Sequence, residues 1–227
     1  MPRPDAIRLV SNPPNPWHAA EVELDEMPPP ASLTMLEDRS RSILTRNESP
    51  DIPFRWSVNP YRGCYHGCAY CYARPSHQYL DLGAGTDFER TLVIKPEAPA
   101  LLRKAFDRRS WTGELVTFSG NTDCYQPLEV SYELTRGCLA VCRDYRNPVD
   151  IITKSTLVER DIPLLVEVSA VAPCRITVSV PFMDAELARA IEPYVPSPAR
   201  RLETIRRLAE AGLEVQVNVA PIIPGLT

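Results

Sequence analysis

The sequence predicts an α/β fold on a parallel sheet, because strand-like and helix-like segments alternate from Phe54 to the end of the chain. Short apolar runs are expected as strands at residues 54–61, 114–119, 149–153, 175–180 and 214–220. Longer segments with apolar residues at helical spacing lie between them, at 96–109, 128–146, 157–171 and 185–211. Such units, joined by right-handed connections, give an open, partial parallel β/α barrel of about five βα units.

The last helical segment has clear end signals. Pro193, Pro196 and Pro198 interrupt it, and Ser197 followed by Pro198 is typical of a helix start. Gly212 stands where a glycine commonly ends a helix. The sequence therefore predicts a helix from about residue 198 to residue 211, followed by the strand 214–220.

Residues 1–53 are predicted to form an irregular, proline-rich arm ahead of a core of residues 54–227. Prolines at 13, 14 and 16 and at 28–30 interrupt any periodicity, and charged residues are scattered between them. At the other end, no covering helix follows the strand 214–220, which would leave an exposed sheet edge. We therefore expect the sequence to be a C-terminally incomplete part of a longer protein.

Composition excludes several classes of protein. No apolar run approaches the roughly 18 residues of a membrane span, so no membrane partner is expected. The N-terminus lacks a signal-peptide pattern, and seven cysteines do not form an even-numbered disulfide framework. These features predict a reducing, cytoplasmic location. The net charge of −4 gives no global basic field for nucleic acid, although a local basic groove is compatible with it.

Three cysteines in one short loop are the most informative feature of the chain. Cys64, Cys68 and Cys71 have C-x3-C-x2-C spacing and follow a predicted strand. Three thiolates suit three irons of a [4Fe-4S] cluster, which normally takes four cysteines. The fourth iron would then be open to a substrate or cofactor. The alternative is a structural zinc site, but zinc normally takes four ligands in two pairs, and no convincing second pair is present.

Other polar residues fall at the ends of the predicted strands. Gly120, Thr122 and Asp123 follow the second strand, Lys154 follows the third, and Ser179 lies on the fourth. Chemistry in parallel α/β sheets gathers at the C-terminal ends of the strands. We therefore expect these residues and the cysteine loop to form one shared site.

The cysteine loop and its flanks resemble the radical S-adenosylmethionine (SAM) superfamily. Within it, the sequence is similar to the DNA repair photolyase-like group, which is related to spore photoproduct lyase. The resemblance is carried by residues 59–77 (NPYRGCYHGCAYCYARPSH), 122–129 (TDCYQPLE), 152–155 (ITKS) and 220–225 (APIIPG). It implies a radical SAM enzyme, lyase- or transferase-like, whose reduced cluster cleaves SAM to a 5′-deoxyadenosyl radical that acts on a substrate.

The resemblance also implies roles for individual residues. Cys64, Cys68 and Cys71 would ligate the cluster, and the amino and carboxylate groups of SAM would chelate the open iron. The residues expected in the SAM pocket come from the cysteine loop and the strand ends: Tyr70, Gly120, Thr122, Asp123, Lys154 and Ser179. An external donor of the flavodoxin or ferredoxin type would supply electrons, and nucleic acid is the implied substrate class.

One position departs from the lyase pattern. Spore photoproduct lyases carry a cysteine that returns hydrogen to the product radical, and Gly120 stands at that place here. Cys124 and Tyr72 are the remaining candidates for a catalytic role, although on a strand-like path Cys124 would point the other way. The substrate therefore stays open. The alternative function is a non-catalytic zinc- or iron-sulfur-binding module with a structural or redox-sensing role.

Overall fold

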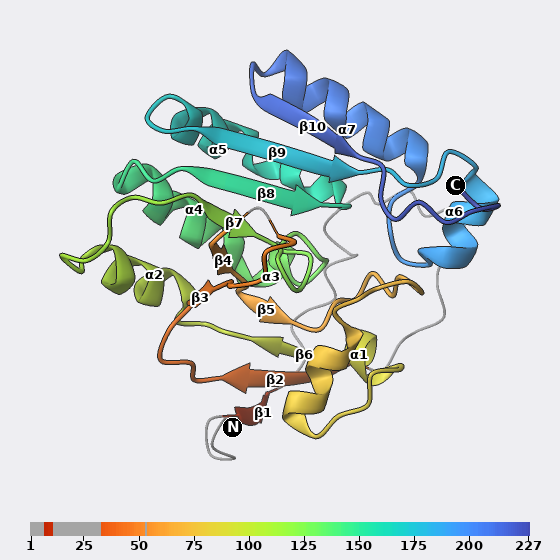
Figure 1. Ribbon diagram of the computed structural model, residues 1–227, viewed down its shortest axis with the longest axis horizontal. Helices are drawn as coiled ribbons and strands as arrows, with labels where there is room; N and C mark the ends of the chain where they lie inside the picture. Colours follow the sequence, from red (N-terminus) through yellow and green to blue (C-terminus); the bar gives the residue numbers. More distant parts are fainter. Residues whose placement is uncertain (1–6, 11–32, 53) are drawn as a thin grey trace.

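A parallel sheet forms the centre of the fold in the computed structural model, which describes residues 7–10, 33–52 and 54–227. Within these residues the main sheet has the strand order β10-β9-β8-β7-β4-β3 (Figure 1). Its strands are β3 (Leu44–Arg46), β4 (Trp56–Val58), β7 (Val116–Phe118), β8 (Val149–Thr153), β9 (Cys174–Ser179) and β10 (Glu214–Asn218). Strands β4, β7, β8, β9 and β10 are parallel, and β3 pairs antiparallel with β4. The predicted open, parallel β/α architecture is confirmed.

Four helices pack against the main sheet. They are α2 (Ala98–Phe106), α4 (Leu134–Asp144), α5 (Ile162–Ser169) and α7 (Pro198–Glu210). Helices α2, α4 and α5 pack side by side, and α7 lies against β9 and β10 (Figure 1). Strand residues Phe118 and Ile151 are fully buried with helix residues Leu139 and Leu165 in the main hydrophobic core. The strand ends are thereby fixed as a rigid edge.

Two predicted helical segments are divided. Segment 128–146 becomes α3 (Glu129–Tyr132) and α4, because Glu133 adopts a left-handed conformation with φ of 48°. Segment 185–211 becomes α6 (Ala185–Ile191) and α7, separated by the prolines. Ser197 caps α7 by accepting a hydrogen bond from the Arg200 N–H, as the sequence predicts. Three shorter helices complete this part: η3 (Arg74–Leu80), α1 (Asp87–Arg90) and η4 (Thr156–Asp161).

A second, smaller sheet corrects the prediction of an irregular arm. Its strand order is β1-β2-β6-β5, with β1 (Ile7–Val10), β2 (Thr34–Asp38), β5 (Tyr61–Arg62) and β6 (Thr91–Ile94). Strands β1, β2 and β3 all lie within residues 1–53, and β3 pairs with β4 across the predicted boundary. The sequence did not reveal them because β2 pairs with β6, far along the chain. The rest of the predicted arm lies outside the described residues.

The described helices include none that is both long and apolar enough to cross a bilayer.

Lys95, directly after β6, gives a pH-dependent test of the small sheet. Burial, together with the charge of Arg62, lowers the pKa of Lys95 from 10.5 to about 8. The folded state therefore loses this proton at a lower pH than the unfolded state. The free energy of unfolding should rise as the pH increases from about 8 towards the unfolded pKa of about 10.4.

In the Lys95→Met variant this rise should be absent, and the protein should be about 1–2 kcal/mol more stable at pH 7, because no ammonium is desolvated. Urea unfolding between pH 7 and pH 10 measures the difference. Exposed Lys104→Met is the matched control, and its profile should follow the parent. Identical pH profiles for Lys95→Met and the parent would contradict the prediction.

Candidate active site

The three cysteines lie on a loop that directly follows β5 and adjoins the C-terminal edge of the main sheet. Cys64 and Cys68 are buried, each with 8% of its surface exposed, and Cys71 is half-buried. All three are free thiols. The loop has almost no regular secondary structure, so other parts of the chain must fix its shape.

The donor set fits a cluster better than a single metal ion. Burial raises the pKa of Cys68, and the charges of Cys64 and Cys71 both raise it further, so the three thiols lie near one another. A zinc ion would require its sulfur ligands at about 2.3 Å from one point. Across the residues described, no group of three or more His, Cys, Asp or Glu side chains is gathered in that way. Three thiols on one loop can ligate three irons of a [4Fe-4S] cluster, whose fourth iron then needs another ligand.

Residues after β7 hold the beginning of the loop. The Gly63 carbonyl accepts hydrogen bonds from Thr122 Oγ1 at 2.5 Å and from Gln126 Nε2 at 3.1 Å. Gln126 Oε1 accepts the Tyr65 N–H at 3.0 Å. Gly63 has φ of 76°, and a Cβ atom there would lie 2.8 Å from the Phe88 carbonyl oxygen, so no side chain fits. Sequence reasoning missed Gln126, which is fully buried.

Asp123 connects the loop to two strand ends. Its carboxylate accepts hydrogen bonds from Thr153 Oγ1 at 2.7 Å and from the backbone N–H groups of Tyr125 and Lys154 at 2.9 and 2.8 Å. His66 Nδ1 lies 3.3 Å from its second oxygen. The carboxylate thus has partners after β7, after β8 and within the cysteine loop. These contacts hold the charge of Asp123 in a buried position.

His66 lies between Asp123 and the first cysteine. Although burial opposes protonation, the charges of Cys64 and Asp123 raise the pKa of His66 from 6.5 to about 10. Although burial raises the pKa of the Cys64 thiol, the charge of the neighbouring His66 lowers it below the ordinary value. The pair favours the thiolate form of Cys64, which is the form that binds metal.

Arg74 fixes the middle of the loop from its other side. Its guanidinium donates to the carbonyl oxygens of Gly67 and Cys68 at 3.0 and 3.1 Å. Glu89 in α1 accepts from the same guanidinium at 2.7 Å and balances its charge. Nothing in the sequence distinguished Arg74 from a surface arginine, because the carbonyls it binds are defined only by the folded loop.

Tyr70 and Lys154 face one another beside the thiols. Lys154 Nζ lies 5.6 Å from the centre of the Tyr70 ring. Burial raises the pKa of both Cys68 and Cys71, and the charge of Lys154 partly offsets this. The structure therefore brings Lys154 close to the loop. Ser179, at the end of β9, is buried and its carbonyl accepts from Arg201 at 2.9 Å.

The remaining predicted residues divide into two groups. Tyr72 is exposed, and its hydroxyl donates to the Gly120 carbonyl at 2.7 Å, so these two residues adjoin the loop. Cys124 is fully buried in the main hydrophobic core, where burial raises its pKa well above the ordinary value. The structure does not bring Cys124 to the cysteine loop, and this position gives no support to a hydrogen-transfer role.

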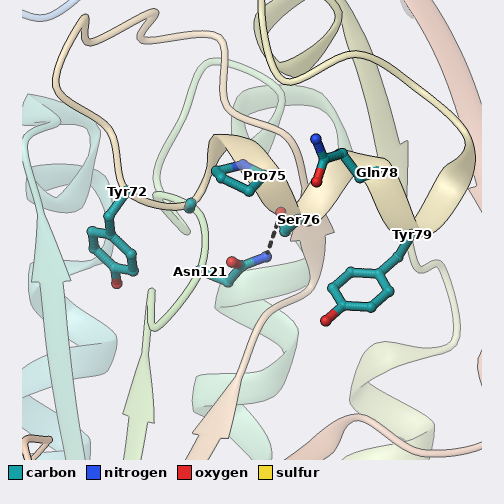
Figure 2. Close-up of a pocket in the computed structure, with 7 residues that line it drawn as sticks. Tyr72, Pro75, Ser76, Gln78, Tyr79 and Asn121 are labelled. Atoms are coloured by element: carbon teal, nitrogen blue, oxygen red, sulfur yellow. Dashed lines mark hydrogen bonds between the residues drawn. The ribbon is translucent and has the colours of Figure 1, made fainter.

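A surface hollow of about 410 Å³ lies next to Tyr72. Figure 2 shows Tyr72 and Tyr79 on opposite sides of it, with Ser76 and Asn121 between them. Asn121 Nδ2 donates to Ser76 Oγ at 3.3 Å. Both tyrosines are 76% exposed, which is unusual for large aromatic side chains. The hollow therefore offers aromatic faces and amide groups immediately after the third cysteine.

Comparison with protein families identifies the superfamily to which the chain belongs. The family model of the radical SAM superfamily matches residues 58–227. This chain belongs to the radical SAM superfamily. The cofactors of this superfamily are a [4Fe-4S] cluster and SAM.

Similar sequences occur in bacteria, archaea and viruses. An uncharacterized protein of Mycobacterium tuberculosis is 44% identical over 176 residues, which are 78% of this chain and 52% of that protein. An uncharacterized protein of Methanocaldococcus jannaschii is 30% identical over 172 residues, covering 76% of this chain and 62% of that protein. The radical SAM chain described here therefore spans about half to three fifths of the length of these relatives.

Solved structures of spore photoproduct lyase share the fold. The enzyme complexed with a dinucleoside spore photoproduct matches with a TM-score of 0.60 and 17% identity, over 84% of this chain and 52% of that one. A structure of the lyase with a single tyrosine-to-phenylalanine substitution matches with a TM-score of 0.58 and 15% identity, over 89% and 58% of the two chains. The radical SAM family is confirmed by the family model, and these structures show that spore photoproduct lyase shares the fold.

Replacing His66 should change the redox behaviour of the cluster. The variant His66→Phe removes the positive charge beside Cys64, and the charge around a cluster helps to set its reduction potential. We expect a more negative midpoint potential, measured by redox titration followed by electron paramagnetic resonance (EPR). His66→Gln retains an amide donor and should shift the potential less. A potential that is unchanged or more positive in His66→Phe would contradict the prediction.

Proposed function

We propose that Cys64, Cys68 and Cys71 hold three irons of the [4Fe-4S] cluster and leave the fourth iron to SAM. The observation that carries this proposal is the set of three buried or half-buried free thiols on one loop, with Lys154 and Tyr70 directed at it. When bound, the cluster supplies the electron for reductive cleavage of SAM. An external donor of the flavodoxin or ferredoxin type provides that electron.

Different residues around the loop are proposed to contact different parts of SAM. We assign the carboxylate of SAM to the Lys154 amine, because that amine is a positive group close to both Cys68 and Cys71. The ring of Tyr70 packs beside the cofactor. Asp123 acts indirectly, since its oxygens already hold the Lys154 N–H and face His66.

The other residues predicted for the SAM pocket fix the shape of the backbone around the site. Thr122 fixes the Gly63 carbonyl, and Gly120 accepts the Tyr72 hydroxyl. A Cβ atom at residue 120 would lie 3.2 Å from Ser57 Cβ, so glycine lets the chain pass close to β4. Ser179 ends β9, and its carbonyl accepts a hydrogen bond from Arg201. These residues shape the edge of the site rather than carry its charge.

Formation of 5′-deoxyadenosine tests the proposal. Anaerobically reconstituted protein, supplied with dithionite and SAM, should produce 5′-deoxyadenosine, and substitution of any one of the three loop cysteines by serine should abolish it. Chromatographic quantification measures the product. Cys174→Ala, outside the loop, is the control and should remain active. Equal product from the parent and the loop variants would refute the assignment.

Lys154 provides a separate test of the SAM assignment. Lys154→Met removes the charge that we pair with the SAM carboxylate, so the apparent KM for SAM should rise by about tenfold or more, as expected for loss of a charge-assisted contact. Lys154→Arg keeps the charge, and its apparent KM for SAM should rise less. Steady-state formation of 5′-deoxyadenosine at varied SAM concentration measures both. An unchanged KM in Lys154→Met would remove Lys154 from the binding site.

For the substrate, we propose a nucleic acid whose base docks in the hollow between Tyr72 and Tyr79. The support is the pair of exposed aromatic rings with nearby amides, together with the fold shared with a lyase complexed with a dinucleoside spore photoproduct. Aromatic side chains bind unstacked bases by stacking, at about 1–3 kcal/mol per base. The reaction that we propose is radical chemistry on this nucleic acid.

The variant Tyr79→Ala tests the docking surface. Loss of one stacking face should weaken binding of a fluorescein-labelled single-stranded oligonucleotide by about 1–3 kcal/mol, measured by fluorescence anisotropy. Tyr79→Phe keeps the ring and should bind like the parent. If Tyr79→Ala binds as tightly as the parent, the hollow is not the docking site.

A further inference from the structure

The segment between α6 and α7 supports the cysteine loop at several points. The Ile191 carbonyl accepts the Ala69 N–H at 2.9 Å, and the His66 carbonyl accepts the Tyr194 N–H at 3.4 Å. The Tyr194 ring packs on Tyr65, with 4.9 Å between the ring centres. A further contact, between Tyr70 and Glu192, joins residues 122 positions apart in the sequence. The loop is therefore held from outside as well as by its own turns.

A buried ion pair lies within this support. Arg201 in α7 donates through Nη2 to Glu192 Oε2 at 2.7 Å, and the two side chains are 1% and 0% exposed. Arg201 also donates through Nη1 to the Ser179 carbonyl. The other oxygen of Glu192 accepts the hydroxyl of Tyr70. The ion pair therefore connects α7 and the end of β9 to the residue between the second and third cysteines.

The physical cost of this arrangement indicates a role other than stability. Removing two charges from water costs several kcal/mol per ion, and replacing a buried pair by apolar residues of similar size is often neutral or stabilising. Arg201 has, in addition, one buried donor, Nε, that makes no hydrogen bond. What the pair achieves is a carboxylate held in one orientation. One of its oxygens faces Arg201 and the other faces Tyr70.

We propose that the Glu192–Arg201 pair positions the cysteine loop for its cluster by holding the hydroxyl of Tyr70. Tyr70 stands between Cys68 and Cys71, so fixing its side chain fixes the spacing of those two thiols. Tyr70, Glu192 and Arg201 act here as positioning residues and ligate no iron. This inference rests on the proposal that the three cysteines hold the cluster.

Cluster retention is the measurement that tests it. Variants Tyr70→Phe and Glu192→Leu/Arg201→Met are reconstituted anaerobically, and iron release to a ferrous chelator is followed by absorbance. We expect each to release iron about tenfold faster than the parent, the lower end of the effect of losing an outer-shell partner. The triple variant, which combines these substitutions, should release iron no faster than either variant, because both remove the same interaction. Tyr145→Phe is the matched control, since it deletes an exposed tyrosine–carboxylate hydrogen bond to Asp107, outside the cysteine loop.

Thermal unfolding of the apoproteins separates positioning from general destabilisation. Apoprotein melting temperatures close to that of the parent, combined with faster iron release, support the proposal. Parent-like release in Tyr70→Phe overturns it, and so do additive effects in the triple variant. If the double variant does not fold, Tyr70→Phe alone decides. A parent protein that takes up no cluster would instead overturn the cluster assignment, and this inference with it.

Discussion

The carboxylate of Asp123 is the interaction on which the site depends most. It is nearly buried, and it accepts hydrogen bonds from the ends of two neighbouring strands while facing His66 in the cysteine loop. A buried charge of this kind is stable only with all its partners in place. The parallel sheet therefore determines where the loop begins, and His66 transmits that position to Cys64. The remaining anchors refine a geometry that Asp123 sets.

Four separate contacts compensate for the absence of regular structure in the loop. Gln126 holds the start of the loop and Arg74 holds its middle. Glu192 holds Tyr70, between the last two cysteines, and Asp123 faces His66. They come from three parts of the chain: the connection between β7 and α3, helix η3, and the segment after α6. A cofactor site must be positioned within a fraction of an ångström, and rigid neighbouring elements achieve this better than a free loop. The surrounding fold thus supplies the preorganisation that three cysteines alone cannot provide.

The sequence alone predicted those features that a short stretch of residues determines. Strand β8 was predicted at its observed bounds because five consecutive residues favour a buried strand, and the cysteine spacing alone indicated a cluster. The parallel-sheet rule also placed Asp123 and Lys154 near the loop. Strands β2 and β6 were missed because each is defined by pairing with the other. Gln126, Arg74 and Glu192 were missed for a similar reason, since their partners are backbone or hydroxyl groups 6 to 122 residues away.

The central claim is that three cysteines hold a cluster with one iron open to SAM. The most direct test is EPR of the anaerobically reconstituted, dithionite-reduced protein, recorded with and without SAM. The account predicts the signal of a reduced [4Fe-4S] cluster that changes when SAM is added. A protein that binds one zinc ion in place of a cluster, or a cluster signal indifferent to SAM, would contradict it.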